Sequence, residues 1–254
     1  MLKNTPLIRK LARLGACLLL LGLGGCSTLV HPPIAGGTPN TLASKPLTLW
    51  QPEDQLKWEA VKLPGKVITR YGLTTLNAHS ALQANADSSA SMLRKTLRIE
   101  PDQLNALSFA WQVPQLLAEA DMAARDHDDS PVRLVLAFEG DRNQFSPKNA
   151  MLSELTHALT GQPMPYATLM YVWCNKRPVG TVIENPRTDR IRKIVVESGT
   201  ARLHQWLSYE RNIKADYEKA FGEAPGALIG IGLMTDSDNT RSKALAWYGP
   251  IELK

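Results

Sequence analysis

Cysteine is scarce in this chain of 254 residues, which contains only Cys17, Cys26 and Cys174. Cys17 and Cys26 lie close to the N-terminus, in a segment that we expect to be processed. Cys174 is then the single thiol of the mature chain, so an intramolecular disulfide is excluded and stability must come from a hydrophobic core. Cys174 follows an apolar run without a nearby histidine, which favours a small buried residue over a reactive thiol.

Long hydrophobic runs are also absent. The apolar stretch that follows the basic residues Lys3, Arg9, Lys10 and Arg13 has about ten residues, roughly half of a membrane span. It ends in Leu23-Gly24-Gly25-Cys26, which resembles the lipobox of bacterial lipoproteins. We therefore expect residues 1–25 to be a lipoprotein signal peptide and Cys26 to carry the lipid. Ser27, in place of a retention aspartate, implies the outer membrane facing the periplasm.

Acidic residues are missing from the expected signal peptide, and this changes the charge of the mature chain. The whole sequence has 29 Lys and Arg against 24 Asp and Glu, a net charge of +5. Removal of four basic residues leaves 25 against 24, or +1. A nearly neutral domain without a basic run offers little to neutralise phosphates, so nucleic acid is not expected as a partner.

The remaining sequence predicts a tether followed by one domain. Residues 26–45 are rich in Pro, Gly, Thr and Ser and are typical of a flexible tether. From residue 46 to 254, short segments alternate apolar and polar residues, which is typical of half-buried strands. Strands are predicted at 107–113 and 132–138, and near 66–71, 80–86, 90–99, 168–175, 192–198, 203–211, 227–235 and 243–253. Short helices are predicted after Pro114, at 148–159 and at 213–221. This pattern favours an all-β, two-sheet antiparallel sandwich or jelly roll with a few short helices in loops.

Catalytic signatures are not found either: the sequence has no Gly-x-Ser-x-Gly elbow, His-Glu-x-x-His, Cys-x-x-Cys or Walker loop. The alternative that the protein is a hydrolase acting on cell-envelope glycans requires a pair of carboxylates in acid and base roles, for which Asp236 and Glu197 are candidates.

One strand suggests a ligand-binding face. If Met170, Val172 and Cys174 face the core, then Tyr171, Trp173 and Asn175 face the other way. With Arg133 on another strand, they would offer rings for stacking on a sugar and polar groups for its hydroxyls, and Trp206 and His204 could join them. The alternative, which the usual burial of tryptophan favours, is that Tyr171 and Trp173 belong to the core.

A turn near the C-terminus offers oxygen-bearing side chains. Asp236, Asp238 and Asn239 could hold a structural calcium ion, because hard cations prefer such ligands. Asp and Asn are also the commonest turn residues, which favours a plain turn. We therefore expect that no cofactor is required, with a structural calcium as the alternative.

Several segments in order resemble the bacterial domain-of-unknown-function family 3047, whose members are typically exported. The matching pieces are residues 86–91, 109–113, 128–133, 171–175, 197–199, 211–212, 216–217, 221–222, 234–240 and 246–249. The resemblance implies a sandwich similar to galactose-binding-like carbohydrate modules and supplies no catalytic residues.

These observations favour one function and leave two alternatives. We expect a lipid-anchored, non-catalytic envelope protein that binds a glycan or another envelope ligand on one sheet face. The alternatives are the hydrolase and a structural lipoprotein that docks an envelope protein, which would need an exposed apolar patch.

Overall fold

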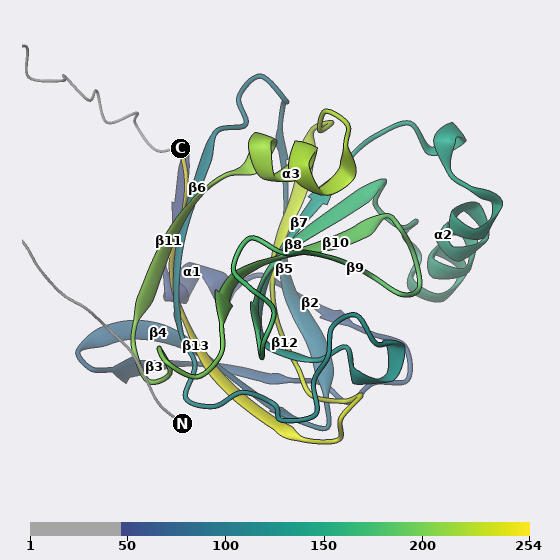
Figure 1. Cartoon of the computed structure of the whole chain (residues 1–254). Helices are drawn as coiled ribbons and strands as arrows, with labels where there is room; N and C mark the ends of the chain where they lie inside the picture. The colour runs from purple at the N-terminus through teal and green to yellow at the C-terminus, as the bar shows by residue number, and fades with distance from the viewer. Residues whose placement is uncertain (1–46) are drawn as a thin grey trace, which may run out of the picture. The chain divides into compact units, whose positions relative to one another are not determined.

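A computed structural model describes residues 47–254, which form two β-sheets packed face to face (Figure 1). Sheet A has the order β11-β6-β13-β4-β3, with β1 added on β13. Its strands are β1 (Thr48–Trp50), β3 (Arg70–Leu76), β4 (His79–Asp87), β6 (Ala106–Gln112), β11 (Leu207–Asn212) and β13 (Lys243–Leu253). All of its pairs are antiparallel.

Sheet B has seven strands in the order β2-β5-β12-β7-β8-β10-β9. They are β2 (Glu59–Lys62), β5 (Ala90–Ile99), β7 (Ser130–Phe138), β8 (Ala167–Cys174), β9 (Val182–Glu184), β10 (Ile191–Ser198) and β12 (Leu228–Asp236). The β8–β10 pair is parallel, a departure from the antiparallel arrangement expected; β9 lies between them in sequence and pairs with the outer side of β10. The two-sheet sandwich itself is confirmed.

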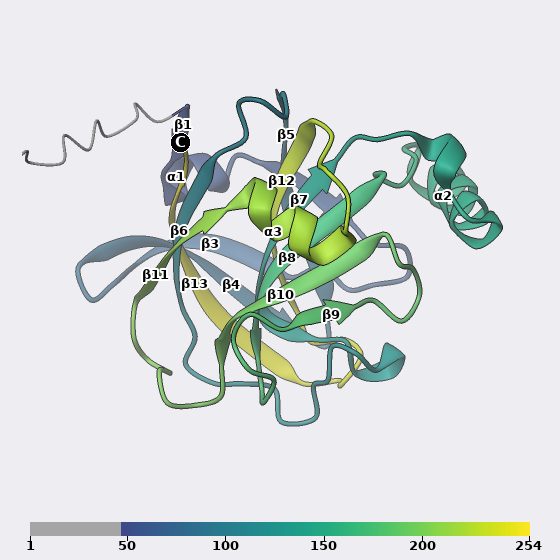
Figure 2. The same ribbon diagram turned by 45° about the horizontal axis from the view of Figure 1, so that its top comes forward.

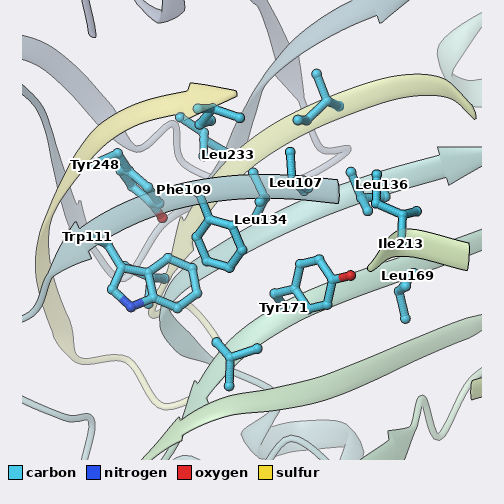
Figure 3. Packing of buried hydrophobic residues seen from close by; sticks show 14 of the residues in the cluster. Leu107, Phe109, Trp111, Leu134, Leu136, Leu169, Tyr171, Ile213, Leu233 and Tyr248 are labelled. Carbon is cyan, nitrogen blue, oxygen red and sulfur yellow. The ribbon is translucent and has the colours of Figure 1, made fainter. Parts of the chain in front are cut away.

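The core lies between the sheets and is built from the apolar residues that alternate along each strand. Figure 3 shows Phe109 of sheet A between its neighbour Trp111 and Tyr171 of sheet B. The rings of Phe109 and Tyr171 are stacked, with centroids 5.6 Å apart. Burial of such large rings is a major source of stability in a domain without disulfides.

Helices are few and lie outside the sheets. They are α1 (Pro52–Gln55), α2 (Pro147–Thr160) and α3 (Ile213–Phe221), with 3₁₀ turns at Arg125–His127 and Arg142–Gln144. The predictions at 148–159 and 213–221 are confirmed, because Ser146 and Asn212 cap the N-termini of these helices and glycines end them. The helix predicted after Pro114 is wrong: residues 114–129 form turns and one 3₁₀ turn.

The expected signal peptide, the lipidation site Cys26 and the tether at 26–45 lie outside the described residues. Among residues 47–254, no helix has the length and apolar character that a membrane crossing needs.

Candidate ligand-binding face

Tyr171 and Trp173 do not lie on an open face, so the platform predicted on β8 is wrong. Both side chains are buried in the core cluster between the sheets. The Tyr171 hydroxyl donates to Asp216 Oδ2 at 2.9 Å, and Trp173 Nε1 donates to the carbonyl of Gly199 at 2.9 Å. Burial, followed by the nearby Asp216, raises the pKa of Tyr171 well above its usual value. Tyr171 and Trp173 face sheet A, which is the reverse of the predicted orientation. The other side of β8 is covered as well, because Val172 and Cys174 belong to a second buried cluster, so neither side of this interior strand is open.

Asn175 also serves the structure. It lies just after β8, and its Nδ2 donates to the carbonyls of Leu117 at 2.7 Å and Ala120 at 3.1 Å. These bonds hold the loop between β6 and β7 against the end of β8. The expected role of Asn175 in orienting a ligand is therefore replaced by a role in fixing this loop.

Arg133 is buried on the outer side of sheet B and is fully occupied by ion pairs. Its Nε donates to Asp236 Oδ1 at 2.8 Å, and its Nη2 donates to Asp236 Oδ2 at 2.9 Å and Asp128 Oδ1 at 3.1 Å. A buried guanidinium with these partners is not available to a ligand. Its predicted binding role is wrong.

Lys193 completes this buried ionic cluster, and the sequence did not reveal it. The side chain is 0% exposed, and Nζ lies 2.7 Å from Asp128 Oδ2 and 2.9 Å from the carbonyl of Met122. Burial and the charge of Arg133 lower the pKa of Lys193 to about 8, against the opposing effect of Asp128. A lysine between Arg192 and Ile194 gave no signal of its partner, which lies 65 residues away in sequence.

Two of the three predicted metal ligands, Asp236 and Asp238, come close together, with Asp129 in place of Asn239, but their oxygens already have partners. Carboxylate oxygens of Asp129, Asp236 and Asp238 lie within 4.8 Å of one another. However, Asp236 is held by Arg133 and Asp238 by Lys66, while Asn239 donates its amide to Asp129 Oδ1 at 3.0 Å. The amide nitrogen of Asn239 thus serves as a donor that holds Asp129. This cluster does not fit a calcium ion, because the positive charges that a cation would supply come from the chain itself.

The carboxylate pair of the hydrolase alternative is not assembled. Asp236 lies on β12 opposite Ser130, while Glu197 lies on β10 opposite Trp173. Two strands separate β12 from β10, which amounts to about 14 Å. Glycosidase carboxylates lie about 5 to 10 Å apart, so these two do not form such a pair.

A different face carries aromatic and amide side chains, the outer face of sheet A. Trp247 on β13 pairs in register with Gln112 on β6 and with Gln83 on β4, and Gln83 pairs with Gly72 on β3. Trp206 precedes β11 by one residue, and the register of that strand places it opposite Gln112. We call these five residues the outer-face row; β11, β6, β13, β4 and β3 can be followed across the sheet in Figure 2.

Trp206 lies across the sheet and is only partly exposed. Its Cζ3 atom is 3.4 Å from the point where a Cβ on Gly249 would sit, so the missing side chain makes room for the indole. Its Nε1 approaches the carbonyl of Leu76 at 3.4 Å, and His79 meets the ring edge-on with centroids 5.7 Å apart. The β3–β4 hairpin therefore reaches over to Trp206 and fixes the orientation of its ring.

Gln112 is the unusual member of the row. The side chain is only 4% exposed, yet its Oε1 accepts no hydrogen bond from any residue between 47 and 254. Its strand neighbour Trp111 fills the core, so the alternation of β6 turns Gln112 outward, next to Trp247. A buried acceptor without a donor costs about 1–3 kcal/mol, which makes this oxygen a candidate ligand contact.

Two hollows flank the row on the same face of sheet A. One, of about 570 Å³, lies between Asn85, His204 and Leu245, and the other, of about 360 Å³, between Ser108, Ser208 and Glu252. The sequence suggested Trp206 and His204, but it did not point to Trp247. The alternation of buried Ala246 and Tyr248 around Trp247 is the signal that could have found it.

The fold and this face define a β-sandwich with an aromatic and amide-lined sheet surface. The model of the DUF3047 family, described as a protein of unknown function, matches residues 56–252, and the chain belongs to this family. No curated protein matches the chain.

Solved structures similar to the chain include carbohydrate-active proteins at low identity. The glycoside hydrolase domain of Endo-D from Streptococcus pneumoniae R6 has a TM-score of 0.33 and 10% identity; the match covers 80% of this chain and 21% of that one. The xylan binding module CBM86 from Roseburia intestinalis has a TM-score of 0.30 and 11% identity, and the match covers 82% of this chain and 93% of that one. The family 11 xylanase from Neocallimastix patriciarum has a TM-score of 0.29 and 9% identity, and the match covers 76% of this chain and 95% of that one. The chain spans about a fifth of the Endo-D domain's chain.

Proposed function

We propose that this protein is a non-catalytic glycan-binding protein of the cell envelope and that the outer-face row of sheet A is its binding site. The observation that carries the proposal is the unpartnered Oε1 of Gln112, in a row with the two partly exposed indoles of Trp206 and Trp247. Indole faces stack on the C–H face of a pyranose, and amides bond its hydroxyls. A sugar hydroxyl that donates to Oε1 would remove the cost of leaving this acceptor unpaired.

The test of the site is Trp247→Ala, with Leu73→Ala as the matched control. Leu73 is an exposed apolar residue of the same sheet on β3, where it points away from the row. We expect Trp247→Ala to weaken binding to purified peptidoglycan and to xylan at least about tenfold, which is about 1.4 kcal/mol. Titrations monitored by tryptophan fluorescence and pull-down with the insoluble polymers measure this. Unchanged binding in Trp247→Ala, with the fold intact by circular dichroism, would overturn the proposal.

The envelope location is part of the same proposal and rests on the lipobox-like segment before Cys26. We expect Cys26→Ser to move the protein from the membrane fraction to the soluble fraction of the envelope. Metabolic labelling with a fatty-acid analogue measures the lipid directly. Labelling that persists in Cys26→Ser would contradict the assignment of this cysteine.

One observation favours docking of an envelope protein as a second candidate function. Met151, Leu155 and Leu159 follow one face of α2 and are 65%, 54% and 60% exposed, and Figure 1 shows α2 projecting from the sheets. Such a stripe is typical of a helix that meets a partner. A photo-crosslinker at position 159 should give a defined envelope adduct that Leu155→Glu abolishes; an unchanged adduct pattern would reject this candidate.

A further inference from the structure

We propose that the outer-face row binds the interior of a linear, uncharged glycan chain that runs across the strands of sheet A. This inference rests on the proposed function. The register that pairs Gln112 with Trp247, Trp247 with Gln83 and Gln83 with Gly72 places these residues side by side on consecutive strands. The line through them is perpendicular to the strands and therefore defines the direction of the site.

The row is long enough for several sugars. Neighbouring strands lie about 4.8 Å apart, so the row from Trp206 to Gly72 spans about 19 Å. An extended chain uses roughly one strand spacing for each ring. The Trp206 indole extends from the β11 edge to Gly249 of β13 and to Leu76 of the β3–β4 hairpin, so it lies beside Trp247 on β13 and not two strands away. Gln112, next to Trp247 in the register, would accept a hydrogen bond from a hydroxyl or amide N–H of the ring that stacks there.

The row carries no charge. Its members are two tryptophans, two glutamines and a glycine, and the nearest charged side chain of the face on β3, that of Arg70, belongs to the neighbouring register opposite Asn85. Recognition of phosphate, sulfate or uronate groups relies on Arg and Lys. The composition of the row therefore favours neutral sugars over charged ones.

Neither end of the row is covered by a further strand of sheet A. β11 and β3 are the terminal strands of the main path of sheet A. At Gly72 a Cβ would meet no atom within 4 Å, so no side chain closes this end. A site that no further strand closes accommodates a chain that continues past it, and we expect it to recognise internal segments rather than chain termini.

The experiment is calorimetric titration of the purified full-length chain with neutral cello-, xylo- and chito-oligosaccharides, from disaccharide to hexasaccharide. We expect affinity for one of these series to rise about tenfold or more from disaccharide to tetrasaccharide. Reduction of the chain end should have no effect, and oligogalacturonides of the same length should bind at least about tenfold more weakly. Equal affinity at every length, loss on end reduction, or preference for the charged series would overturn the inference.

Two variants separate this inference from the proposed function. Gly72→Asp adds a charge where there is open space, and Thr75→Asp adds the same charge on the opposite side of β3. We expect Gly72→Asp to weaken binding of tetrasaccharides and longer chains but not disaccharides, and Thr75→Asp to change neither. If binding does not depend on chain length but Trp247→Ala abolishes it, the inference of an extended chain is refuted, while the outer-face row remains the binding site. If neither the natural chain nor Trp247→Ala binds any of the sugars tested, the proposed function itself is refuted.

Discussion

Lys193 should make the stability of this protein depend on pH between about 8 and 10.5. The folded chain releases the Lys193 proton near pH 8, whereas the ordinary value is 10.5. Between these values the unfolded chain holds more protons, so the free energy of unfolding rises with pH in this window. Below about pH 8 Lys193 is charged in the folded chain, and burial of this charge lowers the free energy of unfolding by its full amount. Above about pH 10.5 Lys193 is neutral in both states, so this loss of stability has disappeared.

The size of the effect follows from this gap. At about 1.4 kcal/mol for each pH unit, the full penalty is about 3 kcal/mol. Roughly 2 kcal/mol of it should be relieved between pH 7 and pH 9.5. The variant Lys193→Met keeps the length of the side chain and removes the proton, so its stability should lack this rise.

The assay is urea unfolding of the natural chain and Lys193→Met from pH 7 to pH 9.5, with the difference between the two curves taken at each pH. Taking the difference cancels the buried tyrosines, whose titration the substitution leaves in place. Lys95→Met, at an exposed position of β5, controls for the loss of a charge. A difference that stays constant within about 0.5 kcal/mol over this range would refute the reasoning.

Two further predictions concern stability and are measured by the same urea unfolding. Asp236→Asn leaves a buried guanidinium without its bidentate partner and should cost about 3–5 kcal/mol, whereas Asp238→Asn, whose lysine partner is exposed, should cost less than about 1 kcal/mol; equal losses would contradict the assignment of the cluster. Gly226→Ala brings a Cβ within 2.2 Å of the carbonyl oxygen of Glu139 and should cost about 1–3 kcal/mol, whereas Gly72→Ala meets nothing and should be nearly neutral; a tolerated alanine at 226 would mean that the backbone can separate there.

The strands could be predicted because alternation is a local property of the sequence. Leu107, Phe109 and Trp111 alternate with small or polar residues, and β6 buries those three as expected. β8 could not be oriented in the same way, since Met170, Val172 and Cys174 are as apolar as the residues between them. Only the covering of its outer side by a second cluster decides that both sets are enclosed.

The candidate site was accessible to sequence reasoning only in part. The outward direction of Gln112 follows from the burial of its neighbours on β6, because side chains alternate along a strand. The residues that surround Gln112 cannot be inferred in this way, because Trp247 and Gln112 are brought together by the pairing of β13 with β6. Trp206 and Leu76, which meet over this face, are 130 residues apart in sequence.

The sequence by itself determined that this protein is a β-sandwich with a single cysteine between residues 47 and 254, and it predicts a nearly neutral domain behind a segment that we expect to be removed. These properties depend on composition and on short periodic patterns, which need no knowledge of distant contacts. The tertiary structure decided which aromatic residues are enclosed, which charges neutralise one another and which sheet face remains open. Those outcomes depend on strand order and register, which bring together residues far apart in the chain.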